Sequence, residues 1–428
     1  MNNSTRNILY RIYPSKKQTQ KLSQWLELHR ELYNATLQER IEAYKMQRES
    51  INYNTQQNYL PQLKKDLPEL VELGSQALQE TIRRVDRAYK AFFRRIKHGE
   101  TPGFPRYKSK NRFNSFTYPA PAGWDIINNT KLKIKISKLG LLKTRGKSRF
   151  AITNCERRCL TIKRKNNKWY AVITVRVNNS LLKRKTNIKQ MAVGIDMGCK
   201  SLAVLSDSNK IDNPKYLKLN KNKLLEIQRK LSKQVKFSNN WYKTKNKLSK
   251  LHEKIANQRK DFLHKTSAKL VTSYSIIGIE HKLDVKKMTK SARGTINNHG
   301  KDVLPMANIL NKVQSVKQKA SLNRSILEAS INIFTSMLKY KAEEAGTVII
   351  EVNKKNTSRE CSVCHSYNLV TLADRVYNCS NCGLSIDRDL NAARNIEFRA
   401  LEKAPYLGWI GCREDSILEA RHHNYTIG

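Results

Sequence analysis

The sequence predicts an α/β protein of several domains. At 428 residues the chain is longer than one typical domain. Stretches with apolar residues at helical spacing alternate along it with short runs rich in β-branched residues. Lys and Arg number 82 against 35 acidic residues, so the net charge is +47 and the pI is near 10.1. Such self-repulsion indicates a polyanionic partner, above all nucleic acid; charge alone leaves a ribosomal-type or membrane-surface binder open.

The first part of the chain predicts a small β-barrel with a helical insertion. A strand-like opening (8–13) precedes a basic helical segment, expected over 15–99, in which apolar residues recur at helical spacing. β-like runs follow at 131–136, 159–163 and 169–177. We therefore assign 1–14 and 100–185 to the barrel. A polar, lysine-rich linker (181–189) follows.

The second part predicts a ribonuclease-H-like α/β fold. Residues 191–196, 201–207 and those around Tyr216 are expected to form a three-stranded meander. A buried strand at 275–280, a helix from about 304 to 344 and a strand at 347–352 come next. A meander followed by strand, helix and strand is the element order of that fold.

Three carboxylates lie where this fold can gather them. Asp196 ends the first central strand, Glu280 ends its buried neighbour, and Asp389 opens a helical segment. Mg²⁺ prefers hard oxygen ligands, and two ions held by such a cluster can hydrolyse a phosphodiester. The alternatives are purely structural roles: Asp387 or Asp389 is only a helix N-cap, and Glu280 is a solvated residue at a strand end. Asp196, between two apolar residues on a central strand, is harder to explain without a bound ion.

Two CxxC pairs form the strongest local motif in the chain. Cys361 and Cys364 are separated from Cys379 and Cys382 by fourteen residues, just under the usual spacing of a four-cysteine zinc ribbon. We expect residues 370–377 to form the hairpin between them. Redox chemistry and buried free thiols are the alternatives. With four thiolate ligands no position remains for a catalytic water, so the zinc is expected to be structural.

Two basic regions are candidates for nucleic-acid contact. Residues 215–260 hold fifteen Lys or Arg and predict two helices that form a hairpin broken near 239–240, although a solvated charged face is the usual explanation of such a run. In the loop after Gly103, basic residues alternate with aromatic ones that could stack on bases or be buried in the barrel. The individual candidates are Arg106, Lys108, Arg112, Arg259 and Lys260.

Targeting signals are not apparent. The N-terminus has no apolar core of a signal peptide, and the longest apolar runs are too short to span a bilayer. Eight cysteines with two CxxC pairs fit metal ligands in a reducing compartment better than a disulfide framework. We therefore expect a cytoplasmic protein with no membrane contact.

The order of several motifs resembles the TnpB family, the transposon-associated RNA-guided nucleases related to compact type V CRISPR effectors. The resemblance covers most of residues 8–400. Its carriers are RIYPSKKQ, YNATLQER, GFPRYKSKNRFNSFTYP, VGIDMGCKSLAVLSD, LHEKIANQRKDFLHK, GIEHKLDVKKM, YKAEEAG, the two CxxC pairs and DRDLNAARNI.

This resemblance implies an architecture and an activity. It implies a wedge barrel with a helical recognition segment (15–99), a RuvC-type nuclease domain (190–355 and 384–400), a zinc ribbon (356–383) and a tail (401–428). It places the catalytic acids, with two Mg²⁺, on Asp196, Glu280 and Asp389. Asn391 fills the family's D-x-N-A-A pattern, and we expect it to contact nucleic acid. A guide RNA and a matching double-stranded DNA next to a short flanking motif are further implications. We expect one protein chain rather than two per guide RNA, although the sequence leaves both open.

The sequence departs from the family pattern in two places, and two other functions stay open. NKKNTSREC replaces the usual proline and aromatic residue before the first CxxC, and residues 291–324 are less typical than their surroundings. A guided repressor that binds DNA without cutting would be expected to have lost acids. A protein-only recombinase or junction resolvase would bind DNA without RNA.

Overall fold

The computed structural model describes residues 3–128, 132–146, 155–178, 190–281, 306–371 and 374–404, with the single positions 152 and 289. The chain divides into two compact units, Met1–Leu182 and Lys183–Gly428. The expected linker (181–189) and most of the expected tail, from residue 405 onward, lie outside the described residues.

The first unit is built on one antiparallel sheet. Its strands are β1 (Asn3–Tyr13), β2 (Ser115–Tyr118), β3 (Trp124–Asn128), β4 (Leu132–Ile136), β5 (Gly140–Arg145), β6 (Glu156–Lys165) and β7 (Lys168–Asn178). Their order is β2-β6-β7-β1-β5-β4-β3. No pairing between β2 and β3 is found among the described residues, so closure into a barrel stays a prediction.

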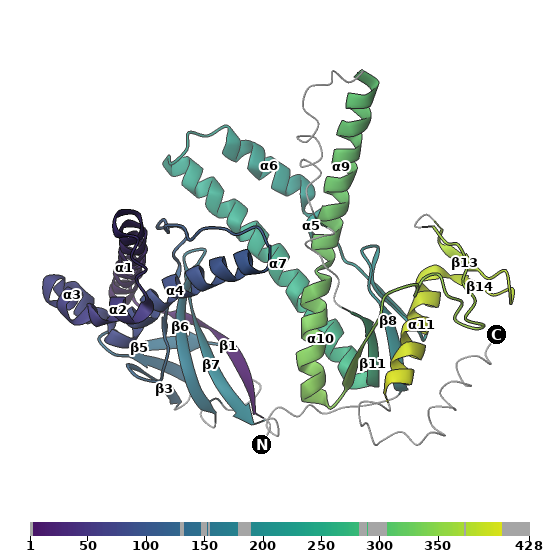
Figure 1. Cartoon of the computed structure of the whole chain (residues 1–428), viewed down its shortest axis with the longest axis horizontal. Helices are drawn as coiled ribbons and strands as arrows, with labels where there is room; N and C mark the ends of the chain where they lie inside the picture. Colours follow the sequence, from purple (N-terminus) through teal and green to yellow (C-terminus); the bar gives the residue numbers. More distant parts are fainter. Residues whose placement is uncertain are drawn as a thin grey trace. The chain divides into compact units, whose positions relative to one another are not determined.

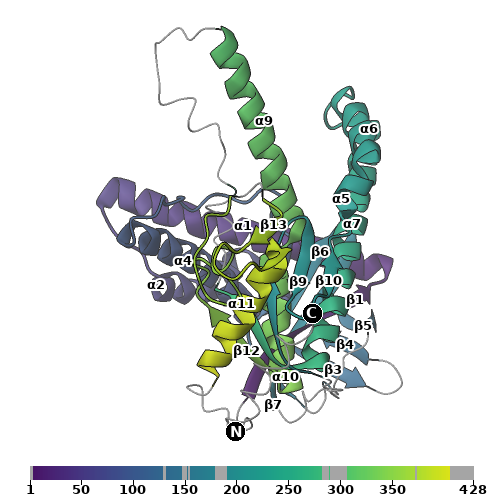
Figure 2. The ribbon, with the colours of Figure 1, turned by 90° about the vertical axis from the view of Figure 1, so that its right-hand side faces the viewer.

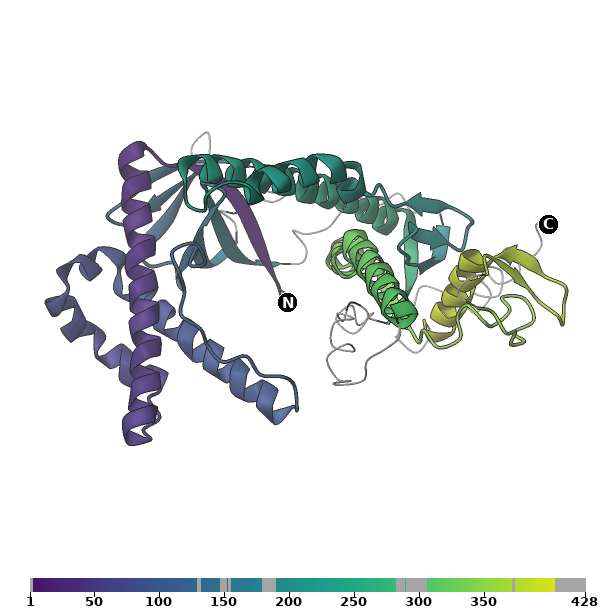
Figure 3. The same cartoon turned by 90° about the horizontal axis from the view of Figure 1, so that it is seen from above.

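A helical segment is inserted between β1 and β2. It comprises α1 (Lys16–Gln47), α2 (Tyr53–Asn58), α3 (Leu60–Asp66), a 3-10 turn (Pro68–Leu73) and α4 (Ser75–Lys97), with α1 and α4 in purple to blue in Figure 3. Ser15 caps α1 in a capping box with Gln18. The helices pack on the sheet through His29, which is fully buried, stacks on Phe116 with ring centroids 4.9 Å apart and hydrogen-bonds Thr81 at 2.7 Å.

The second unit contains a mixed five-stranded sheet. The strands β8 (Gln190–Asp196), β9 (Ser201–Leu205) and β10 (Lys210–Asp212) form an antiparallel meander. The strands β11 (Tyr274–Glu280) and β12 (Val348–Val352) extend it in parallel, in the order β10-β9-β8-β11-β12. The predicted third strand is misplaced: Tyr216 begins a short helix, α5 (Tyr216–Leu219), because Glu328 accepts hydrogen bonds from two backbone N–H groups in its first turn.

Helices cover both faces of this sheet. The helices α7 (Asn239–Ser273) and α10 (Ile331–Ala345) pack on one face, and α11 (Arg388–Lys403) packs on the other. Figures 1 and 2 show α10 and α11 on opposite sides of the strands. The expected single helix over 304–344 is two helices, α9 (Met306–Ala329) and α10, because Ser330 between them adopts a left-handed conformation with φ 54°.

A helical hairpin follows the meander. It is formed by α6 (Lys221–Ser232) and α7, joined by residues 233–238 and visible in teal in Figure 1. Leu224, Leu251 and Ile255 are buried between the two helices. The hairpin is therefore as the sequence predicts, but the turn lies before Asn239 and Asn240, since Ser238 caps α7 through the Trp241 N–H.

Candidate metal centres

Two of the predicted acids lie at adjacent strand ends and on the same face of the sheet. Strands β8 and β11 are parallel, with Ile195 opposite Ile279, so Asp196 and Glu280 occupy equivalent positions. Side chains alternate between the faces of a strand. Ile195 and Ile279 pack in the core beneath α7 and α10, which leaves both acids on the face that α11 covers.

Helix α11 approaches this face unusually closely, because each strand carries a glycine there. Gly194 and Gly278 are direct partners across β8 and β11. A Cβ atom on Gly194 would lie 2.0 Å from the Ala393 carbonyl oxygen, and one on Gly278 would lie 2.8 Å from the Ala400 Cβ. The paired glycines therefore set the position of the helix whose first turn contains Asp389.

At the start of α11, one of the two candidate aspartates caps the helix and the other is left for the site. Asp387 is the N-cap, and its Oδ1 accepts hydrogen bonds from the backbone N–H groups of Asp389 (2.8 Å) and Leu390 (3.2 Å). The carboxylate of Asp389 is not used for capping. It lies 3.6 Å from the Arg388 guanidinium and close enough to Asp196 to act on its ionisation.

The electrostatics of the three acids are those of a carboxylate cluster. Burial, together with the neighbouring charges of Glu280 and Asp389, raises the pKa of Asp196 to about 7, while the charge of Arg388 opposes the shift. Burial also raises the pKa of Glu280, against the Thr357 hydroxyl and the charges of Lys354 and Arg399. The three half-buried acids form a group of like charges that fits a divalent cation, because hard carboxylate oxygens are the ligands that Mg²⁺ prefers.

The four predicted zinc ligands converge more tightly than the acids. The thiols of Cys361, Cys364, Cys379 and Cys382 all lie within 4.8 Å of one another; within the described ranges no other group of three or more candidate ligands meets this limit. The Sγ atoms are 3.6 Å apart in the pairs Cys361–Cys382 and Cys364–Cys379. Sulfurs around a tetrahedral Zn²⁺ at ~2.3 Å are separated by ~3.8 Å, so the cluster is compatible with zinc.

The two CxxC turns have matching backbones. In each, the residue after the second cysteine is left-handed: His365 with φ 57° and Gly383 with φ 73°. Each of these residues donates its N–H to the carbonyl of the first cysteine of its pair, at 3.1 and 3.0 Å. The predicted hairpin over 370–377 is wrong in position, because the antiparallel pair is β13 (Val376–Asn378) with β14 (Ser385–Asp387), on either side of the second turn.

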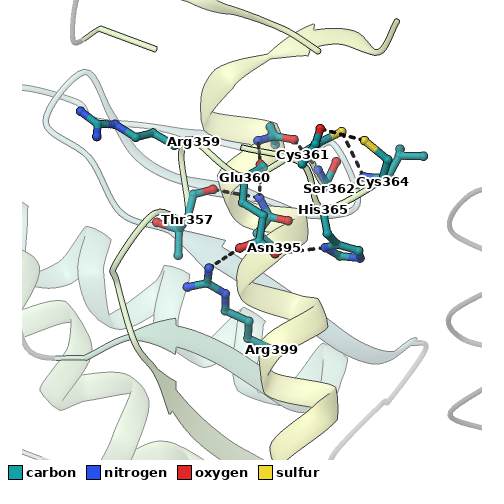
Figure 4. A network of polar contacts seen from close by, with 12 residues as sticks. Thr357, Arg359, Glu360, Cys361, Ser362, Cys364, His365, Asn395 and Arg399 are labelled. Atoms are coloured by element: carbon teal, nitrogen blue, oxygen red, sulfur yellow. Dashed lines mark hydrogen bonds and ion pairs between the residues drawn. The ribbon is translucent and has the colours of Figure 1, made fainter. Parts of the chain in front are cut away.

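A short segment connects the two candidate centres. Residues 353–362, here called the linking segment, run from β12 to the first CxxC turn, and Figure 4 shows their polar contacts with α11. Thr357 donates its hydroxyl to Glu280 Oε1 at 2.8 Å. Asn395 on α11 donates to the carbonyls of Thr357 (2.9 Å) and Glu360 (2.7 Å). Arg399, one turn further, pairs with the Glu360 carboxylate.

Asn391 lies in the same network and not at a surface. Its side chain is fully buried, donates to the Glu360 carbonyl at 2.7 Å and accepts from the Ser362 N–H at 2.9 Å. Both ends of the amide are used within the protein. The expected contact of Asn391 with nucleic acid therefore has no support in this geometry.

The other predicted nucleic-acid ligands are on accessible parts of both units. Arg106 and Arg112 are exposed, and Lys108 is half-buried with its Nζ 5.9 Å from the Tyr33 ring. In the second unit, Lys260 is exposed and Arg259 is half-buried on α7. Of the aromatic residues after Gly103, the buried ones are Phe113, Phe116 and Tyr118, and the exposed ones are Phe104 and Tyr107.

The tip of the hairpin of α6 and α7 carries a cluster of aromatic side chains, which the count of charged residues does not reveal. Phe237 is 69% exposed although its φ of 69° is unfavourable for an aromatic residue. Its ring lies 5.5 Å from that of Trp241 and 6.5 Å from that of Tyr242, and Lys245 Nζ is 4.5 Å from the Trp241 ring centroid. Aromatic side chains thus gather at the end of a lysine-rich hairpin.

Three site residues are not apparent from the sequence patterns: Thr357, Asn395 and Arg399. Polar residues at the spacing i, i+4, i+8 from Asn391 could have indicated one binding face of α11. The sequence does not reveal which segment that face contacts, because the partners of Asn395 are 35 and 38 positions away in the chain. Among the described residues, no helix combines the length and apolarity needed to cross a bilayer.

Three family descriptions match parts of the chain. "Probable transposase" matches residues 172–292, and "Cas12f1-like, TNB domain" matches residues 332–396, which run from α10 through the CxxC turns into α11. "Helix-turn-helix domain" matches residues 1–49, where the structure has β1 and the single long helix α1.

Whole-chain relatives give the same assignment. The chain is 30% identical over 390 residues, 90% of either protein, to Escherichia coli (strain K12) "Putative RNA-guided DNA endonuclease InsQ". It is 28% identical to a Streptomyces pristinaespiralis protein of the same description, over 90% of this chain and 87% of that one. The solved structure "Cryo-EM structure of the Cas12f1-sgRNA-target DNA complex" shares the fold, with a TM-score of 0.52 and 13% identity over 93% of this chain and 99% of that one. The chain belongs to the TnpB family.

Proposed function

We propose that this chain is an RNA-guided, Mg²⁺-dependent DNA endonuclease that hydrolyses phosphodiesters with Asp196, Glu280 and Asp389. One observation carries the proposal: Asp196 and Glu280 lie on the same face of one sheet, and Asp389 lies at the start of the helix that covers that face. The charges of Glu280 and Asp389 add to burial in raising the pKa of Asp196. The descriptions of the bacterial relatives support the guided cutting of DNA. The retention of all three acids favours cutting over binding alone.

The three carboxylates would hold the Mg²⁺ ions. When bound, the ions supply an activated water and neutralise charge at the scissile phosphate. The chain itself contributes preorganisation. Strands β8 and β11 fix Asp196 and Glu280, the Asp387 cap leaves Asp389 available, and the paired glycines hold α11 against the sheet. Mutual repulsion of the acids makes the metal-free site unfavourable, which strengthens cation binding.

The remaining architecture has a place in this proposal. Residues 190–355 and 384–400 would form a RuvC-like nuclease domain, with a zinc ribbon at 356–383. The zinc would be structural, because all four ligands are thiolates. The first unit would supply a wedge barrel and a helical recognition segment that read the shape of the guide duplex and a flanking DNA motif.

Two surfaces are proposed to contact the guide RNA and target DNA. The loop with Arg106, Lys108 and Arg112 lies on the first unit. On the second unit, the hairpin of α6 and α7 presents Arg259, Lys260 and an aromatic tip that could stack on bases. Their positive charge favours phosphate contacts whose strength falls with salt. We propose one protein chain per guide RNA.

Copurification tests the proposal. The protein is purified from cells, its bound RNA is sequenced, and the complex is incubated with Mg²⁺ and a duplex that matches the RNA. We expect a defined RNA and cutting that Asp196→Ala abolishes. Asp212→Ala is a matched control, because Asp212 is an exposed carboxylate on β10 of the same sheet.

The same experiment separates the alternatives. A defined RNA with binding but no cutting of the matched duplex would identify a guided repressor. Cutting without bound RNA would identify a protein-only recombinase or resolvase. Cutting that survives Asp196→Ala would contradict the assignment of the acids.

A further inference from the structure

We propose that Thr357 is a positioning residue for Glu280, and that Asn391 and Asn395 hold the linking segment so that the first CxxC turn and Glu280 form one rigid unit. The inference rests on the proposed function, because it concerns the metal-binding geometry of Glu280. The buried polar contacts of the linking segment would then orient a metal ligand, in addition to stabilising the fold.

The contact between Thr357 and Glu280 has the geometry of an orienting hydrogen bond. The Thr357 side chain is 2% exposed, and its hydroxyl lies 2.8 Å from Glu280 Oε1. The alternative acceptor, the Lys354 carbonyl, is further away at 3.3 Å. A hydrogen bond to one oxygen of a ligating carboxylate fixes its rotation and leaves the other oxygen to the cation.

Thr357 is in turn held by an amide whose orientation is determined by its neighbours. The Asn395 Nδ2 group has two hydrogens and faces two carbonyl oxygens, those of Thr357 at 2.9 Å and Glu360 at 2.7 Å. In the opposite orientation the amide oxygen would face both carbonyl oxygens and repel them. Asn395 is buried, so these are strong and specific contacts.

Asn391 makes the matching connection to the first CxxC turn. It donates to the same Glu360 carbonyl at 2.7 Å and accepts from the N–H of Ser362, the residue after Cys361. Further along α11, Arg399 donates to the carbonyls of Asn353 (2.8 Å) and Lys355 (2.9 Å). The linking segment is thus held along its length by one face of α11.

The helix that holds the linking segment also contains Asp389. Asn391, Asn395 and Arg399 are four residues apart and so lie on one face, beginning half a turn after Asp389. A single rigid helix therefore places one acid directly and orients a second one through Thr357. Bound zinc would stabilise the far end of the linking segment at Cys361.

The test compares two substitutions at Thr357 in the full chain with its copurified RNA. Thr357→Val keeps the shape and removes the hydroxyl, whereas Thr357→Ser keeps the hydroxyl. The readouts are Mn²⁺ affinity, from the electron paramagnetic resonance signal of free Mn²⁺, together with zinc content and the Mg²⁺ dependence of cutting. We expect Thr357→Val to weaken Mn²⁺ binding about 10- to 100-fold with zinc retained. Thr357→Ser should stay within about threefold of the parent protein.

A double-mutant cycle tests the connection to α11. Asn395→Ala alone should weaken Mn²⁺ binding, and in the Thr357→Val background it should add little, because both changes release the same carboxylate. Fully additive effects would contradict a shared pathway through Thr357.

The proposal is overturned if Thr357→Val binds Mn²⁺ as the parent protein does, if Thr357→Ser is equally defective, or if Thr357→Val loses its zinc. An Asp196→Ala arm separates this failure from that of the proposed function. If Asp196→Ala binds Mn²⁺ undiminished, the carboxylate site itself is wrong. If it does not bind and Thr357→Val binds normally, only the positioning proposal fails.

Discussion

Gly194 and Gly278 lie opposite each other on adjacent parallel strands, and α11 passes directly over both. Two residues further along each strand, and on the same face, are Asp196 and Glu280. The distance from helix to sheet, and with it the position of Asp389 relative to the two strand acids, is therefore a consequence of the same two glycines. In each strand the glycine that contacts the helix and the acid are two positions apart, which is the spacing of residues on one face of a β-strand.

Gly194→Ala should strongly destabilise the second unit. Its Cβ would lie 2.0 Å from one backbone atom of α11 and 2.4 Å from another, and backbone cannot move aside as a flexible side chain can. We expect a loss of about 3 kcal/mol or more in the free energy of unfolding, measured by urea denaturation. Gly103→Ala is the control, because the nearest atom there is 3.9 Å away on a flexible Arg95 side chain. An unchanged urea midpoint for Gly194→Ala would contradict the close packing.

Asp196 should make the stability of the Mg²⁺-free protein depend on pH. Its pKa is raised from 3.8 to about 7 in the folded protein, so between these values the folded state binds more protons than the unfolded state. The contribution of Asp196 to the free energy of unfolding is therefore highest at low pH and falls as the pH rises from about 4 to about 7. Asp196→Asn should remove that dependence and raise the melting temperature at pH 8 by a few degrees.

Thermal melts of both proteins at pH 5 and pH 8, without divalent cations, measure this effect. Comparing the two proteins separates Asp196 from other buried acids such as Glu397, whose pKa burial also raises to about 7. Addition of Mg²⁺ at pH 8 should stabilise the parent protein and leave Asp196→Asn unchanged. The reverse pH trend would show that Asp196 is charged and already neutralised in the free protein.

One zinc ion per chain should be bound, and its removal should unfold the CxxC region. Cys379→Ser removes one of four converging thiols, so zinc content by mass spectrometry should fall well below one per chain. Hydrogen exchange should then increase across 357–390. Cys159→Ser is the control, since Cys159 lies on β6 in the other unit. Full zinc retention by Cys379→Ser would contradict the four-cysteine site.

The hairpin of α6 and α7 should strengthen RNA binding mainly through charge. Lys236, Lys243 and Lys247 are exposed near its tip. Replacing all three by alanine should weaken RNA binding and reduce the slope of log K against log salt by about 0.7 for each phosphate that the hairpin no longer neutralises. The triple Lys→Arg variant keeps the charges and should retain the parent slope. Equal slopes for the alanine variant and the parent protein would show that the hairpin does not bind phosphate.

The sequence was most informative where a pattern is local. Strand alternation, the CxxC spacing and the two-helix hairpin depend on residues close in sequence. Four of the five strands of the second unit, the cysteine cluster and the positions of Asp196 and Glu280 at strand ends could therefore be predicted. Tyr216 was assigned to a strand because its helix depends on Glu328, more than a hundred residues away. The break at Ser330 likewise has no Gly or Pro to signal it.

The parts of the site that the sequence did not reveal depend on long-range polar contacts. Asn391 matches a motif, but its burial beneath the linking segment is visible only once α11 and residues 353–362 are placed together. The same is true of Thr357, whose partner Glu280 is 77 positions away. Such contacts leave no period in the sequence, because each depends on how two distant segments pack.

If Asp196, Glu280 and Asp389 together hold divalent cations, crystals of the protein–RNA complex soaked in Mn²⁺ should reveal the ion by its anomalous scattering. We expect a peak within about 2.2 Å of oxygens from these three carboxylates. A strong Mn²⁺ peak elsewhere, with none between these acids, would contradict the claim.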